Sequence, residues 1–151
     1  MRRAKIVGGA AGAIRALHLR PHPEGGHYRE TWRDTAKPRG SGTAIYYLLK
    51  RGEQSRWHRI DAVEIWHYYA GAPLLLRIRA DRRVKTIRLG PHIADGERPQ
   101  AIVPKNAWQS ACSTGAWSLV GCTVSPAFEF SGFELADDYV PAPSGPRFSR
   151  K

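Results

Sequence analysis

The feature that most constrains this chain is a series of short, strand-like runs at near-even spacing. The runs are rich in β-branched and aromatic residues, and turn-forming pairs such as Gly90-Pro91 and Asp95-Gly96 separate them. Many short strands of this kind predict an all-β protein, an antiparallel jelly-roll barrel. The expected strands cover residues 27–33, 43–49, 56–60, 63–69, 74–79, 84–89, 100–103, 108–113, 117–124 and 128–130.

One short helix is expected before the strands. Apolar residues recur at helical spacing from Ala10 to Leu17, and Pro21 follows them. The chain has 151 residues, which is the size of one domain, and it contains neither an internal repeat nor a dividing linker. We therefore expect one domain over residues 14–140, between a flexible N-terminus (1–13) and a flexible proline-rich tail (141–151).

The pattern of apolar residues and the positions of the two cysteines indicate where in the cell the protein resides. No apolar run approaches the roughly 18 residues of a membrane helix, so we expect no membrane partner. The stretch after Lys5 is mostly glycine and alanine and lacks the apolar centre of a signal peptide. Cys112 and Cys122 fall in two runs that predict one hairpin, at positions too far apart for a disulfide. Two reduced thiols are typical of a cytoplasmic protein.

The formal net charge of +11 raises the question of nucleic acid. The 24 Lys and Arg residues are scattered along the chain, however. Only between Arg77 and Arg88 are they dense, and there they alternate with apolar residues, as in a strand pair with one solvated face. This pattern favours a solvated basic face or an anionic small ligand over a nucleic-acid partner.

Two neighbouring expected strands carry the residues best suited to chemistry. Because side chains alternate along a strand, His58, Glu64, Trp66 and Tyr68 can share one face, whereas His67 has the opposite parity. If that face points into a barrel, an imidazole and a carboxylate meet in an enclosed space walled by aromatic rings. Such a space suits general acid–base catalysis or metal binding. The alternative is a surface strand with an ordinary glutamate.

The spacing of this stretch resembles the first conserved motif of the cupin superfamily. Gly52, His58, Glu64 and Gly71 stand in the matching places, and Ile60 stands where the superfamily has a second histidine ligand. The resemblance therefore implies a metal-site position that has lost its donor.

The second cupin motif is similar to residues 104–109, where Gln109 stands in place of a histidine. The metal set that the resemblance implies is thus His58, Glu64 and Gln109. Because Ile60 offers no donor and Gln109 is a neutral amide, we expect either no cofactor or a weakly bound divalent metal.

The opening segment, with its His-Pro-Glu-Gly-Gly run at 22–26, resembles the start of a small cupin subgroup of unknown function, cupin type 5. Further matches continue in order from about Ile14 to Val140. The resemblance implies a small jelly-roll barrel, usually a homodimer, whose pocket has no established ligand. Within the opening segment Tyr28 and Glu30 share a strand face, so they either line the pocket or lie on an edge strand.

Three functions are compatible with these residues. The first is a metal-free, isomerase- or epimerase-like enzyme, in which His58 is the base and Glu64 orients it, as the resemblance to metal-poor sugar-nucleotide epimerases of the superfamily implies. Its ligand would be sugar-like, or would carry a carboxylate or phosphate held by Arg56 or Arg59. The second is a metal-dependent enzyme, and the third a non-catalytic module that binds a small molecule. The expected ligand-binding residues are Tyr28, Glu30, Trp66, Tyr68 and Gln109.

Overall fold

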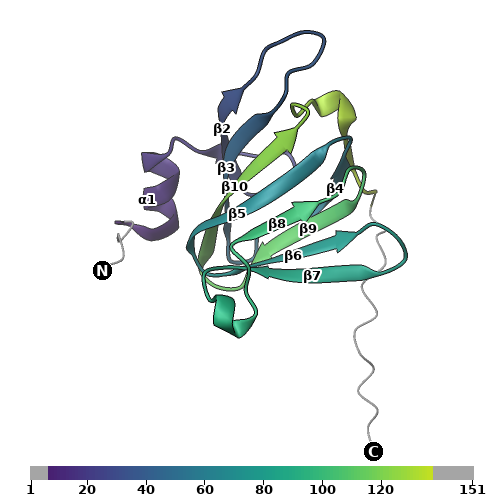
Figure 1. Cartoon of the computed structure of the whole chain (residues 1–151). Helices are drawn as coiled ribbons and strands as arrows, with labels where there is room; N and C mark the ends of the chain where they lie inside the picture. The colour runs from purple at the N-terminus through teal and green to yellow at the C-terminus, as the bar shows by residue number, and fades with distance from the viewer. Residues whose placement is uncertain (1–6, 138–151) are drawn as a thin grey trace, which may run out of the picture.

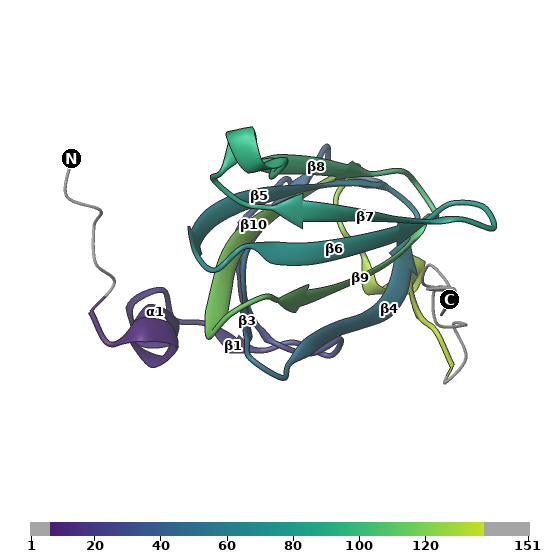
Figure 2. The ribbon, with the colours of Figure 1, turned by 90° about the horizontal axis from the view of Figure 1, so that it is seen from below.

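Two antiparallel sheets face each other in the computed structural model, which describes residues 7–137 (Figure 1). The six-stranded sheet runs in the order β1 (Arg20–Pro21), β2 (His27–Arg33), β3 (Thr43–Lys50), β10 (Trp117–Ser125), β5 (Val63–Gly71) and β8 (Gln100–Val103). The five-stranded sheet runs in the order β11 (Phe133–Leu135), β4 (Gln54–Ile60), β9 (Trp108–Ser113), β6 (Leu74–Arg79) and β7 (Val84–Leu89). Viewed from below, the strands curve around a common interior (Figure 2). The all-β jelly-roll prediction is confirmed.

Alternation along the strands decides which side chains face the interior. In β6, Leu74, Leu76 and Ile78 are buried, and the residues between them are half-exposed. β6 pairs with β7 over its whole length, from Leu74 opposite Leu89 to Arg79 opposite Val84. The dense basic stretch is therefore a strand pair with a solvated face, as expected.

The prediction that β9 and β10 form a hairpin is wrong. β9 pairs with β4 and β6, whereas β10 pairs with β3 and β5, so the short turn between them crosses from one sheet to the other. Each strand is central in its own sheet and has consecutive buried residues, a pattern that fits a hairpin and a crossing equally well. Cys112 and Cys122 are both free thiols, as expected, but the two strands that carry them belong to opposite sheets.

The last expected strand is also misplaced. Residues 128–130 are not a strand; a 3₁₀ turn, Phe130–Gly132, follows them, and the strand is β11, Phe133–Leu135. The rings of Phe128, Phe130 and Phe133 pack edge-on with centroids 5.0–6.0 Å apart. The phenylalanines that predicted a strand at 128–130 therefore belong to a cluster in which three rings pack against one another.

The helix α1 (Gly9–Ala16) lies beside the six-stranded sheet (Figure 1). Its buried Ala13 packs in a cluster with Leu19, Leu48 and Leu119. The helix therefore begins inside the N-terminal stretch that was expected to be flexible. Residues 1–6 of that stretch, and the whole expected tail 141–151, lie outside the described residues. Among residues 7–137 no helix has the length and apolar character to cross a membrane.

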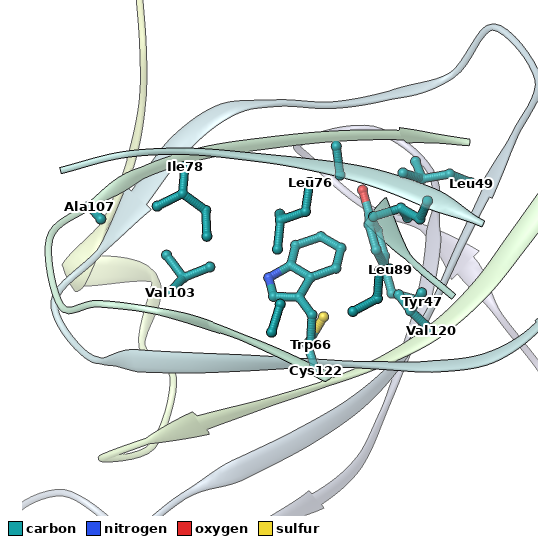
Figure 3. Close-up of a cluster of buried hydrophobic side chains, with 13 residues drawn as sticks. Tyr47, Leu49, Trp66, Leu76, Ile78, Leu89, Val103, Ala107, Val120 and Cys122 are labelled. Carbon is teal, nitrogen blue, oxygen red and sulfur yellow. The ribbon is translucent and has the colours of Figure 1, made fainter. Parts of the chain in front are cut away.

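The main core lies between the two sheets. Figure 3 shows Trp66 among Leu76, Val103 and Cys122, with Tyr47 and Leu89 nearby. We call the following buried residues the apolar cluster: Tyr47, Leu49, Trp66, Leu74, Leu76, Leu89 and Ala111. Their burial supplies the hydrophobic driving force of the barrel.

Candidate functional site

A cavity opens inside the barrel, between the strands that carry the predicted site residues. It measures about 520 Å³ when the part open to solvent is counted. Its lining residues are His22, Glu24, Tyr28, Glu30, Thr43, Ile45, His58, Ile60, Glu64, Cys122, Val124, Phe128, Phe130 and Phe133. Within residues 7–137, neither a lysine nor an arginine lines it. This basic protein thus encloses an acidic and aromatic cavity.

His58, on β4, is buried and bound at both ring nitrogens. Its Nε2 lies 2.9 Å from Oε2 of Glu24, and its Nδ1 lies 2.7 Å from the backbone oxygen of Arg56. A carboxylate and a carbonyl accept hydrogen bonds, so both nitrogens act as donors and the ring is cationic. Burial opposes that charge, but Glu24 outweighs it and raises the pKa of His58 to about 9.

Glu24 reaches His58 from the loop between β1 and β2. Gly25 follows it with φ +113°, and a Cβ built there would lie 1.9 Å from the backbone oxygen of Gln54. Only glycine allows the loop to approach β4 this closely. The backbone N–H of Arg56 donates to the backbone oxygen of Glu24 and fixes the approach. Burial alone would raise the pKa of Glu24, but the charge of His58 lowers it below its ordinary value.

His22 stands next to this ion pair and stays neutral. Its Nδ1 accepts a hydrogen bond from the backbone N–H of Glu24 at 3.1 Å. Burial lowers the pKa of His22 and outweighs the opposing effect of the Glu24 carboxylate. The two histidines of the cavity therefore differ in charge, because only His58 donates directly to the carboxylate at hydrogen-bond distance.

Glu64, on β5, has a different environment. Its Oε2 accepts a hydrogen bond of 2.6 Å from Nε2 of Gln109, and Oε1 of Gln109 accepts one of 2.8 Å from Nε1 of Trp66. The amide is thus oriented by the indole, and it presents its NH₂ group to the carboxyl. Burial raises the pKa of Glu64 to about 7, although the charge of His58 pulls it down.

The structure brings together His58, Glu64 and Gln109, as predicted from the motif. It also places Tyr28 and Glu30 on the cavity wall. Glu30 is exposed and forms an ion pair with Arg33, with 2.8 Å between Oε1 and Nε. Tyr28 and Glu30 therefore line the cavity, and both alternatives describe this strand, because among residues 7–137 β1 pairs only with His27 and Tyr28 and leaves the rest of β2 as a sheet edge.

Three of the expected ligand-binding residues, Trp66, Tyr68 and Gln109, do not line the cavity. Trp66 is buried in the core and acts on the site only through Gln109. Tyr68 donates its hydroxyl to the backbone oxygen of Gly71 at 2.7 Å. His67 lies away from the cavity, as its parity predicted, with Nε2 3.3 Å from Oγ1 of Thr123.

The arginines expected to hold an anion lie elsewhere. Arg56 donates to the backbone oxygen of Pro23 at 2.8 Å, and it is exposed. Arg59 pairs with Glu134, with 2.7 Å between Nη2 and Oε2, and lies over the ring of Trp108. The expectation that Arg56 or Arg59 binds a phosphate or carboxylate in the cavity is therefore wrong.

Glu24 and His22 are the site residues that strand alternation could not find. Both lie in a loop, where side-chain direction has no period of two. The signal was the glycine pair that follows Glu24 in the opening motif, because a Gly-Gly step indicates a close backbone approach.

The residues that the cupin resemblance assigns to a metal do not fit one in this arrangement. Both nitrogens of His58 are engaged as donors, and the oxygen of Gln109 is taken by Trp66. Ile60 lines the cavity and offers no donor atom. Over residues 7–137, no group of three or more His, Cys, Asp and Glu side chains is placed to hold a metal ion. The chemistry derived below therefore uses protein groups alone.

Comparison with known proteins identifies relatives of this chain. The family model Cupin_5, described as "Cupin superfamily (DUF985)", matches residues 11–136. None of the curated proteins compared with the chain matches it.

Two solved structures are similar over most of their length. A protein from Shewanella oneidensis shares 39% identity, with a TM-score of 0.80, over 84% of each chain. A hypothetical protein from Leishmania major shares 32% identity, with a TM-score of 0.79, over 83% of this chain and 85% of its own. An oxalate decarboxylase variant from Bacillus subtilis has a TM-score of 0.62 at 15% identity, over 79% of this chain and 30% of its own, and shares the fold alone.

Proposed function

The chain belongs to the Cupin_5 family of the cupin superfamily, and on that basis we propose that its cavity binds a small sugar-like molecule and exchanges a proton with it through Glu64. The observation that carries this proposal is a buried carboxyl on the cavity wall whose hydrogen-bond donor is the neutral amide of Gln109. A carboxyl in this setting can hold or release a proton without breaking an ion pair.

The lining supports a neutral hydroxylated ligand over an anionic one. Glu24, Glu30 and Glu64 line the cavity against one cation, His58, whose charge Glu24 already balances, so a carboxylate or phosphate would meet a net like charge there. Hydroxyl groups can donate hydrogen bonds to these carboxylates, and the rings of Phe128 and Phe133 offer apolar contact to the face of a sugar ring. Of the two ligand types expected from the sequence, only the sugar-like one is retained.

Glu64 takes over the role that the motif suggested for His58. A base must accept a proton, and both nitrogens of His58 already carry one. The pKa of Glu64, raised by burial to about 7, makes both of its protonation states accessible near neutral pH. In an isomerisation Glu64 removes a proton from one atom of the ligand and returns it to another, so atoms and charge balance. The cationic His58 would stabilise negative charge that develops on a ligand oxygen.

A deuterium-exchange experiment tests binding and catalysis separately. The protein is first screened by thermal shift against neutral aldoses, ketoses and polyols, with their carboxylate and phosphate analogues for comparison. Hits are then incubated in D₂O, and NMR follows the carbon-bound protons of the ligand. We expect Glu64→Gln to abolish exchange while binding persists, and the matched control Glu134→Gln, at an exposed carboxylate, to behave as wild type.

Each other outcome has a definite meaning. Neutral-ligand binding without exchange in the wild type would identify a non-catalytic binding module and overturn the proton-transfer part. Exchange that survives Glu64→Gln would remove Glu64 from the reaction. Stronger binding of the anionic analogues than of the neutral compounds would overturn the ligand class.

A further inference from the structure

A second concave surface lies outside the barrel, where the free edges of the two sheets meet. β8 ends the six-stranded sheet and β7 ends the five-stranded sheet, and the two strands lie side by side (Figure 2). Within residues 7–137 the one isolated bridge near them is parallel and joins Leu89, at the end of β7, to Arg98, two residues before β8. Beyond that bridge a solvent-open groove of about 930 Å³ separates them, which we call the edge groove.

The edge groove is basic and aliphatic. Lys85, Arg88 and Arg98 line it, and a smaller hollow that shares Lys85 with it adds Arg83 together with one acidic residue, Asp81. Arg88 is balanced by the buried Glu97, with 2.9 Å between Nε and Oε2. Lys85, Arg83 and Arg98, by contrast, form no salt bridge in the described part of the chain. Ile102, whose side chain is 59% exposed, borders both hollows.

The cations of the edge groove also have a simpler explanation, in which they only protect a free sheet edge. Cations on an edge strand prevent other chains from adding to the sheet. Charge repulsion, however, acts only on a basic strand and does not exclude an acidic one. A strand with acidic residues meets unpaired backbone groups, an aliphatic wall and complementary charge at the same place.

We propose that the edge groove docks an extended acidic segment of a partner protein, which adds to the free edge of β7 or β8. Backbone pairing supplies the orientation, the exposed Ile102 contacts an apolar side chain, and the unpaired cations contact acidic ones. This inference is independent of the ligand proposed for the barrel cavity, because the two surfaces share none of their lining residues.

Other occupants fit less well. The parts of this chain outside the described residues carry three cations and no acidic residue in 1–6, and three cations with one acidic residue in 138–151. A second copy of the chain brings a further charge of +11. Single-stranded nucleic acid is held by stacking on aromatic rings, and neither hollow has an aromatic lining residue.

The test uses the full chain and a fluorescein-labelled ten-residue peptide of alternating Glu and Val. Fluorescence anisotropy at physiological salt should show saturable binding, which Lys85→Glu/Arg98→Glu weakens at least tenfold. The matched control, Arg20→Glu/Arg51→Glu, makes the same charge change at exposed residues, and β1, which carries Arg20, ends the sheet at the edge opposite β8. We expect it to change affinity less than twofold.

A second comparison needs only the wild-type protein. The same peptide with every other backbone nitrogen methylated keeps its charge but cannot pair as a strand, and it should bind at least tenfold more weakly. Equal binding of the methylated peptide, or equal loss in the control variant, would reduce the effect to general charge attraction and overturn the proposal. Tighter binding of a ten-nucleotide oligo-dT, or no binding of the peptide, would overturn it as well.

Discussion

The apolar cluster and the buried polar residues in and beside the cavity occupy equivalent inward-facing positions of the same barrel. The apolar residues pack the core, whereas the polar residues form hydrogen bonds and ion pairs. β5 carries Glu64 and Trp66 two residues apart on one face, and β9 carries Gln109 and Ala111 in the same way. All four side chains are buried. The fold therefore fixes only that these positions face inward, and the side-chain chemistry decides whether a position packs or reacts.

The two groups of residues also differ in how much they contribute to the free energy of folding. Burying an apolar side chain contributes about 25 cal/mol per Å² to folding. A buried ion pair such as His58–Glu24 loses hydration that its Coulomb attraction only partly restores. Polar groups retained at such positions are therefore better explained by a role in binding or catalysis than by stability, and the following changes test that contrast.

The largest effect is expected from Glu24→Ala. The change leaves His58 buried without its carboxylate, and breaking a buried pair by removing one partner destabilises by about 3 to 5 kcal/mol. Urea unfolding followed by circular dichroism measures the loss. Glu134→Ala, at an exposed ion pair, serves as the control and should cost no more than about 1 kcal/mol. Equal losses of unfolding free energy in the two variants would mean that the buried pair contributes no more to stability than the exposed one.

Leu76→Ala should destabilise the protein by about 2 to 5 kcal/mol, because it opens a hole in the apolar cluster. It should leave ligand binding in the cavity unaltered, because Leu76 packs in the core and does not line the cavity. Unfolding and thermal-shift measurements on the same variant check both statements. A loss of ligand binding in Leu76→Ala would show that the apolar cluster and the cavity residues are not separable.

Glu64→Gln should change how stability depends on pH. The raised pKa of Glu64 means that the folded protein holds a proton that the unfolded chain releases above about pH 4.5. Wild-type stability therefore falls as pH rises from about 4.5 to 7, and the glutamine variant escapes this loss. The free-energy gap should shift in favour of the variant by about 3 kcal/mol between pH 4.5 and 8 and level off above that. A constant gap from pH 4.5 to 8 would contradict the raised pKa.

The smallest effect is expected from Gln109→Leu, about 1 to 2 kcal/mol. It leaves the indole N–H of Trp66 buried without an acceptor, and it removes the hydrogen bond that favours ionised Glu64. The pKa of Glu64 should therefore rise above that of the wild type. Carbon-13 NMR of the glutamate carboxyls measures the titration midpoint of Glu64. An unchanged midpoint would show that the Gln109 amide does not affect the pKa of Glu64.

Strand alternation and motif spacing were sufficient to place His58, Glu64 and Gln109 inside the barrel, because a period of two leaves little freedom once the strands are known. They could not identify Glu24 as the partner of His58, since that contact joins a loop to a strand residue 34 positions further along the chain. Nor could local pattern separate a hairpin from a crossing at β9 and β10, because both strands are buried on both faces. The homodimer stays a prediction, which light scattering can test.

Titration of the His58 side chain tests the central claim most directly. Nitrogen-15 NMR distinguishes an imidazolium, with both nitrogens protonated, from either neutral tautomer. We predict that His58 is an imidazolium at pH 7.5, titrates with a midpoint of about 9, and loses that elevation in Glu24→Gln. A neutral ring at pH 7.5, with a midpoint near the ordinary histidine value of about 6.5, would contradict the account and restore His58 as the candidate base.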